Sequence, residues 1–105
     1  MKPRYISISK YTTTPGPRLI EEGEFSAEWF VEKIGVLDGP IILDLYNTAG
    51  FARSSLSELF YRWVKRYGFD WCILNIMVLA ENFETWQECM ESMIEARDFL
   101  LIKKK

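Results

Sequence analysis

Two adjacent serines, Ser54 and Ser55, are the residues best placed for chemistry, because they stand directly before a helical apolar pattern. Ser55 and Glu58 have the spacing of a capping box, which stabilises a helix start by about 1 kcal/mol. Phosphorylation of either serine would add negative charge at a helix N-terminus beside Arg53, which is electrostatically favourable and would alter a docking surface. The sequence leaves the capping and phosphoacceptor interpretations both open.

The chain contains no histidine. Histidine is the commonest general base near neutral pH and the commonest zinc ligand. A serine nucleophile would therefore lack its usual activating base, and the acidic residues form nothing like a calcium loop. We expect a protein with no catalytic residues, no metal site and no cofactor.

Asp44 interrupts an apolar run of strand length. A charge there must be hydrogen-bonded or lie near the end of the strand, and we expect it to anchor the following loop. The alternative is a small polar ligand site formed with Asn47, Thr48 and the start of the next helix, because ligands of α/β proteins bind at the carboxyl ends of strands.

The charges are nearly balanced, with 13 basic and 15 acidic residues, so nothing attracts the whole molecule to nucleic acid. A local basic cluster favours docking on an acidic protein surface; it consists of Arg53, Arg62, Lys65 and Arg66. An acidic ridge suggests a second function, an inhibitor that mimics nucleic acid; it consists of Glu84, Glu88, Glu91 and Glu95.

The two cysteines, Cys72 and Cys89, lie in an apolar run and in a helical pattern, without a paired-cysteine motif. Buried free thiols in a reducing cytoplasm are the expected outcome. No apolar segment of a signal peptide follows Lys2 and Arg4, and the longest apolar stretch, residues 71–80, is too short to cross a bilayer. We expect a cytoplasmic protein that makes no membrane contact.

We expect one domain over residues 1–105 to position these residues. A chain of 105 residues has the length of a single domain, and its 49% hydrophobic residues are enough to form a buried core. The apolar patterns and turn residues predict strands at 4–11, 18–23, 41–46 and 71–80. Helices are expected at 27–34, at 56–67 and after Asn82, and each of the first two ends at a glycine. The class is therefore α/β, with a mixed sheet in the order β-β-α-β-α-β-α and a parallel crossover between 41–46 and 71–80.

Apolar stripes indicate which side of each helix is buried. The stripe of the second helix consists of Leu56, Leu59, Phe60, Trp63, Val64 and Tyr67. The stripe expected for the third helix consists of Phe83, Trp86, Met90, Met93 and Ile94. Residues 99–105 either extend that helix or form a last strand. Trp29 and Trp71 are either exposed side chains that bind a partner protein or side chains packed in the fold.

The segments "GPRLIEEGEFSAEWF" (16–30) and "LDLYNTAGFARSSLSELF" (43–60) resemble the bacterial STAS-like family, a domain of unknown function. That family is similar to STAS domains, the fold of sulphate transporters and anti-sigma-factor antagonists, and Glu58, Leu59 and Phe60 match its motif. The resemblance implies a small α/β domain, bacterial or phage in origin, which binds a regulatory ATPase or kinase and presents a serine to it without catalysis of its own.

Protein binding is accordingly the expected function, through the 47–57 loop and the start of the second helix. The expected contact residues are Asn47, Thr48, Phe51, Arg53, Ser54, Ser55, Ser57 and Arg62. Nucleic-acid binding by the basic face of that helix, or mimicry by the acidic ridge, is the alternative. The oligomeric state and the identity of the partner do not follow from the sequence.

Overall fold

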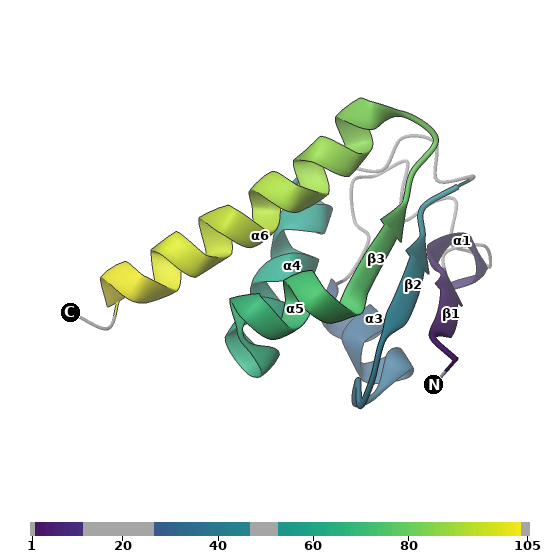
Figure 1. Ribbon diagram of the computed structural model, residues 1–105, viewed down its shortest axis with the longest axis horizontal. Coiled ribbons are helices and arrows are strands. Elements are labelled where there is room, and N and C mark those ends of the chain that lie inside the picture. Colours follow the sequence, from purple (N-terminus) through teal and green to yellow (C-terminus); the bar gives the residue numbers. More distant parts are fainter. Residues whose placement is uncertain (1, 12–26, 47–52, 104–105) are drawn as a thin grey trace.

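The computed structural model describes residues 2–11, 27–46 and 53–103, which form helices around a small sheet (Figure 1). The elements follow one another as β1 (Arg4–Ser7), α1 (Ile8–Tyr11), α3 (Ala27–Ile34), β2 (Ile41–Asp44), α4 (Arg53–Tyr67), α5 (Phe69–Asn75), β3 (Ile76–Leu79) and α6 (Phe83–Lys103). The α/β class is confirmed. Over the described residues, no helix is both long enough and apolar enough to cross a membrane.

The described strands form a parallel sheet in the order β1-β2-β3. The parallel pairing of the apolar segments at 41–46 and 71–80 is thus confirmed. The carboxyl ends of all three strands meet at one edge, where Ser7, Asp44 and Leu79 share a register position. The predicted strand at 18–23 lies outside the described residues, and the finer β-β-α-β-α-β-α order stays a prediction.

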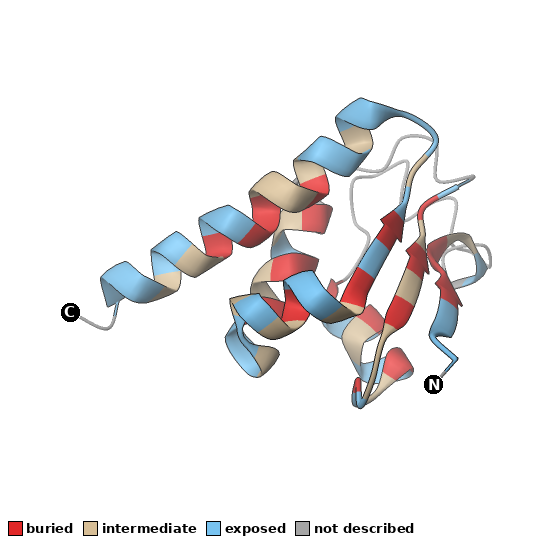
Figure 2. Cartoon of the chain, viewed as in Figure 1, coloured by how far each residue is buried: buried red, intermediate tan, exposed pale blue. Residues whose placement is uncertain are grey.

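The two faces of the sheet differ in burial, because side chains alternate along a strand. One row across the strands, formed by Ile6, Leu43 and Val78, is buried beneath the helices. On the opposite face, Tyr5 and Met77 belong to the neighbouring row and are more than half exposed (Figure 2). Figure 1 shows α3 behind the strands and α4 beside β3, behind α6.

The core forms where α3 and α4 pack on the buried face. The indole of Trp63 lies against Phe30 of α3 and Phe60 of α4, with ring centroids 6.3 and 5.9 Å apart. The stripe predicted for the second helix is confirmed: Tyr67 is partly buried against the core, and the other members are buried, namely Leu56, Leu59, Phe60, Trp63 and Val64. Both helix-ending glycines are confirmed too: Gly35 and Gly68 have positive φ, which L-residues rarely adopt.

Two predicted strands are shorter than expected. The segment 4–11 is extended only to Ser7 and then turns into α1, which fits the consecutive burial of Ile6, Ser7 and Ile8. The segment 71–80 begins as α5 and becomes a strand only at Ile76. A continuous apolar run does not distinguish a buried helix from a buried strand. The strand part of this run is as short as its partner, because β2 has only four residues with which β3 can pair.

The long helix α6 begins after Asn82, whose Oδ1 accepts a hydrogen bond from the Thr85 N–H at 2.8 Å, as a helix cap does. The helix continues to Lys103, so residues 99–103 extend it. The predicted buried stripe is wrong in part: Met93 is buried, whereas Phe83, Trp86 and Ile94 are exposed. The buried stripe is instead formed by Cys89, Ser92, Met93 and Ala96.

Candidate functional site

The predicted site falls between the end of β2 at Asp44 and the beginning of α4 at Arg53. Residues 47–52, and with them Asn47, Thr48 and Phe51, lie outside the described part of the chain. The helix itself begins at Arg53, so Ser54 and Ser55 belong to its first turn by backbone conformation. Their side chains lie outside the described structure.

This start corrects the predicted capping box. An N-cap residue has non-helical backbone, whereas Ser55 lies inside α4. The backbone N–H groups of the first turn have no acceptor within the helix, so serines in that turn occupy the positive end of the helix dipole. Glu58 pairs instead with Arg62 one turn later, at 2.8 Å between Oε1 and Nε.

Asp44 anchors the edge of the sheet, as expected. Its Oδ1 accepts a hydrogen bond from the Tyr46 N–H at 2.8 Å, which fixes the first residues after β2. Its Oδ2 accepts a hydrogen bond from the Tyr5 hydroxyl, which reaches across from β1. Both carboxylate oxygens are thus engaged in holding the edge together.

Beyond its first turn, α4 is fixed from two sides. The buried stripe holds it to the sheet and α3, and α6 packs along its other flank. At this second contact the Ser57 and Ser92 Oγ atoms are 3.3 Å apart. A hollow of about 190 Å³ opens beside them, lined by Ser57, Tyr61, Ser92, Glu95, Ala96 and Phe99. Of the predicted contact residues, Ser57 therefore lies at a helix–helix contact.

The predicted basic cluster is divided along α4: Arg53 is the first residue of the helix, whereas Arg62, Lys65 and Arg66 lie toward its C-terminal end, where cations favour the dipole. Arg62 is held by its ion pair with Glu58, and the Arg66 guanidinium lies 5.4 Å from the centre of the Tyr67 ring. Lys65 is exposed. An exposed pair of this kind contributes roughly 0.3–0.5 kcal/mol to stability, so Arg62 can exchange Glu58 for an acidic partner at little cost.

The two tryptophans in question have different surroundings. Trp29 on α3 is 38% exposed, with Lys33 Nζ 5.8 Å from its ring centre. Trp71 on α5 is half-buried and stacks on Tyr67, with centroids 4.9 Å apart. Trp29 is therefore partly exposed at the surface, whereas Trp71 is part of the packing between α4 and α5.

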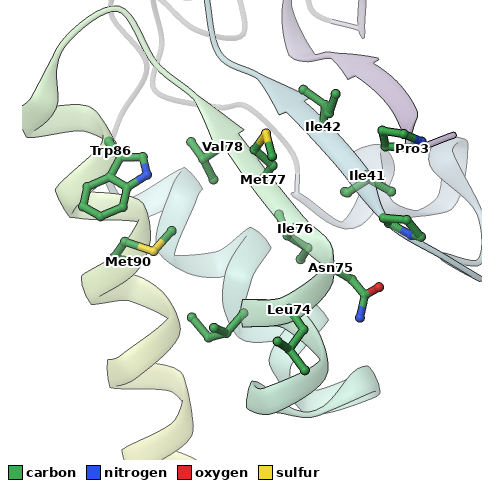
Figure 3. Close-up of a pocket in the computed structure, with 12 residues that line it drawn as sticks. Pro3, Ile41, Ile42, Leu74, Asn75, Ile76, Met77, Val78, Trp86 and Met90 are labelled. Carbon is green, nitrogen blue, oxygen red and sulfur yellow. The ribbon is translucent and has the colours of Figure 1, made fainter. Parts of the chain in front are cut away.

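An apolar groove on the open side of the sheet was missed by the sequence reasoning. Figure 3 shows Trp86 and Met90 on α6 facing β3 and the end of α5. The groove between them has a volume of about 380 Å³. Leu74 at the end of α5 and Met77 on β3 are 81% and 59% exposed beside it. Their helical spacing predicts that both residues belong to the core: Met90 is partly buried and packs against it, whereas Trp86 is 40% exposed.

The cysteines are both buried and free, as predicted. Burial raises the pKa of the Cys72 thiol to about 12, and burial together with the nearby Glu88 charge raises the pKa of Cys89 to about 12. Both thiols are thus protonated at neutral pH, which makes them poor nucleophiles. Within the described residues, no group of three or more Cys, Asp or Glu side chains is arranged to hold a metal ion.

The described part of the candidate site thus consists of the anchored carboxylate of Asp44 at the end of β2 and the first turn of α4. No protein-family model, curated protein or solved structure matches the chain.

Proposed function

We propose that this chain is a non-catalytic protein-binding domain, which docks on a partner protein through residues 47–57 and the first turns of α4. A kinase-like ATPase is the first candidate for the partner, following the resemblance of residues 16–30 and 43–60 to STAS-like domains. The STAS-like strand order and a reducing cytoplasm are part of the proposal, and the free buried thiols favour the latter.

The observation that carries the proposal is the position of the start of α4. The helix begins beyond the carboxyl ends of parallel strands, the edge at which α/β proteins place their ligands. From Leu56 onward the helix is anchored by buried side chains, so its first turn stands on a rigid support. Rigid elements hold binding groups more precisely than loops do.

Phosphorylation of Ser54 or Ser55 is the proposed switch. A phosphate carries about two negative charges at neutral pH, and the first turn of a helix favours negative charge. Arg53 precedes both serines in the sequence and supplies a cation for the modified form. The modification would change the charge of the docking surface without requiring the helix to unfold.

The test is affinity capture from lysate with the immobilised domain, comparing the wild type with Arg53→Glu and Ser55→Asp. We expect both variants to recover at least about tenfold less partner, which corresponds to roughly 1.4 kcal/mol of binding free energy. Lys33→Glu on α3 is the matched control for charge reversal, because Lys33 is exposed on another helix. It should recover the partner normally.

Ser55→Ala tests the phosphorylation of Ser55 separately from the binding of the partner. It should retain the partner but lose any phosphate that mass spectrometry detects after incubation with ATP and lysate. Unchanged recovery with both Arg53→Glu and Ser55→Asp would remove this surface from the proposal. Salt-dependent retention on a DNA column, abolished by Arg62→Glu, would favour nucleic-acid binding in its place.

A further inference from the structure

The hollow between α4 and α6 has a lining unlike that of the apolar groove. Its volume of about 190 Å³ suits one extended side chain, whereas pockets for drug-sized ligands begin at about 300 Å³. The lining residues lie three or four positions apart on each helix and therefore share a face. They are Ser57 and Tyr61 of α4 and Ser92, Glu95, Ala96 and Phe99 of α6. The hollow thus combines hydroxyl, carboxylate and aromatic groups.

Glu95 is the one ionic residue among those that line the hollow. It is exposed, and within the described structure no ion pair or hydrogen bond engages its carboxylate. Two other carboxylates on the same helices are engaged, since Glu58 pairs with Arg62 and Asp98 pairs with Arg97. Glu95 is therefore available as the counter-ion of a bound cation.

The two serine hydroxyls supply further acceptors. Ser92 is 2% exposed, and its Oγ lies 3.3 Å from the Ser57 Oγ. A hydroxyl has one proton to donate and two lone pairs that accept, so lone pairs remain after one bond between the two oxygens. An ammonium group has three N–H donors, and the two hydroxyls together with the Glu95 carboxylate match them in number.

Two aromatic rings form most of the apolar lining. Tyr61 and Phe99 meet edge to face, with centroids 5.8 Å apart and planes at 70°. The faces of such rings attract cations, and Phe99 already does so within the chain, because Lys103 Nζ lies 5.5 Å from its centre. Lys103 itself does not line the hollow. Together with Ala96, the rings can pack on the methylene groups of a ligand, as apolar surfaces do on lysine and arginine stems.

This lining disfavours other classes of ligand. An anion would meet the Glu95 carboxylate and no cation among the lining residues. Calcium takes about six to eight oxygen ligands, whereas the hollow supplies one carboxylate between aromatic rings. An uncharged ligand would gain no ion pair from Glu95. The chemistry that uses every part of the lining is that of a positive charge on an apolar arm.

We propose that the hollow between α4 and α6 binds an organic cation, an ammonium or guanidinium group on an apolar arm, with Glu95 as its counter-ion. One source of this chemistry is a lysine or arginine of the partner protein, because Ser57 belongs both to the hollow and to the proposed docking surface. The other source is a free alkylamine. The first source rests on the proposed function, whereas the site itself does not.

Titration with n-butylammonium chloride, followed by NMR of the full chain, tests the site without any partner. The amide signals of Ser57, Ser92 and Ala96 should shift with the cation and not with sodium chloride of the same ionic strength. 1-Butanol carries a hydroxyl in place of the ammonium group. It should bind at least about threefold more weakly, because it forms no ion pair.

Glu95→Gln keeps the size of the side chain and removes its charge. It should weaken n-butylammonium binding about three- to fivefold, as expected for an ion pair with an exposed carboxylate, and should leave the response to 1-butanol unchanged. Glu84→Gln is the matched control, because Glu84 is exposed on the same helix and does not line the hollow. Phe99→Leu should weaken binding of the cation, and not of the alcohol, by at least about twofold.

The affinity of the partner distinguishes the two sources. If its lysine or arginine occupies the hollow, Glu95→Gln should weaken partner binding as it weakens n-butylammonium binding. An unchanged partner affinity would assign the hollow to a free alkylamine. A wild type whose signals do not shift with n-butylammonium, or a Glu95→Gln variant that binds it equally well, would overturn the inference, whether or not Arg53→Glu releases the partner.

Discussion

The hydroxyl oxygen of Tyr67, at the end of α4, accepts a hydrogen bond from the backbone N–H of Leu37 at 2.8 Å. The bond joins the last turn of α4 to the segment that leads from α3 into β2. Leu37 is 3% exposed, so water has little access to its N–H group. The bond therefore holds together the two crossovers of the sheet.

Removing this hydroxyl should leave a buried donor without an acceptor. We expect Tyr67→Phe to lower the free energy of unfolding by about 1–3 kcal/mol, although the ring and its stacking on Trp71 are retained. Urea unfolding measures the change. Tyr46→Phe is the control, since Tyr46 is 46% exposed and should change stability by no more than about 0.5 kcal/mol. Equal effects of the two substitutions would contradict the structural role of the bond.

Trp63 lies at the centre of the core and is fully buried. We expect Trp63→Ala to cost about 3–5 kcal/mol, a large part of the stability of a small domain. Within the described structure its Nε1 is a buried nitrogen without a hydrogen-bond partner. Trp63→Phe removes that polar group and keeps a ring, so its cost in thermal or urea unfolding should be less than half as large. A phenylalanine variant as unstable as the alanine variant would contradict this.

Gly68 separates α4 from α5 with φ 92° and ψ 151°. An added Cβ would meet no atom within 4 Å, so a substitution there is opposed by backbone strain and not by a clash. We expect Gly68→Ala to cost about 1–3 kcal/mol. Gly68→Asn should cost as much, because asparagine tolerates the left-handed helical region and not this more extended one. Urea unfolding of both variants checks this, and a near-neutral asparagine variant would be evidence against the described backbone.

The buried thiols should make stability depend on pH in the alkaline range. The folded chain holds the protons of Cys72 and Cys89 up to a pKa of about 12, whereas the unfolded thiols release theirs near 9.0. Between these values the unfolded state binds fewer protons, so stability falls as the pH rises from 9 to 12 and is unaffected below 9. Each thiol contributes at most about 1.4 kcal/mol per pH unit.

Unfolding curves at several pH values measure this effect. The comparison is with the Cys72→Ala/Cys89→Ala double variant, which keeps every other ionisable group of the chain. Its stability should decline less steeply above pH 9 than that of the wild type. Identical slopes, or rapid labelling of the folded wild type by a thiol reagent at neutral pH, would show that the thiols are accessible.

The helices that pack directly on the sheet were predictable from the sequence. In α3 and α4 the large apolar residues recur with helical spacing, and these same side chains are buried. Both helices also end at glycines with positive φ. Local chemistry and tertiary packing agree there, which is why periodicity alone located these elements.

Other features depended on contacts that periodicity does not encode. The buried stripe of α6 contains Ser92 and Ala96, small residues that lie against α4, whereas Trp86 stays at the surface. At the candidate site the role of Asp44 as an anchor was predictable, because a carboxylate in an apolar strand needs a partner. Its bond from Tyr5 was not, since it depends on the register between β1 and β2.

The most direct measurement of the central claim is the solution affinity of the captured partner for two variants of the domain. Arg53→Glu should bind at least about tenfold more weakly than the wild type, whereas Lys33→Glu should bind with wild-type affinity. Equal binding by Arg53→Glu and the wild type would contradict the account, because it would show that the partner does not contact the start of α4.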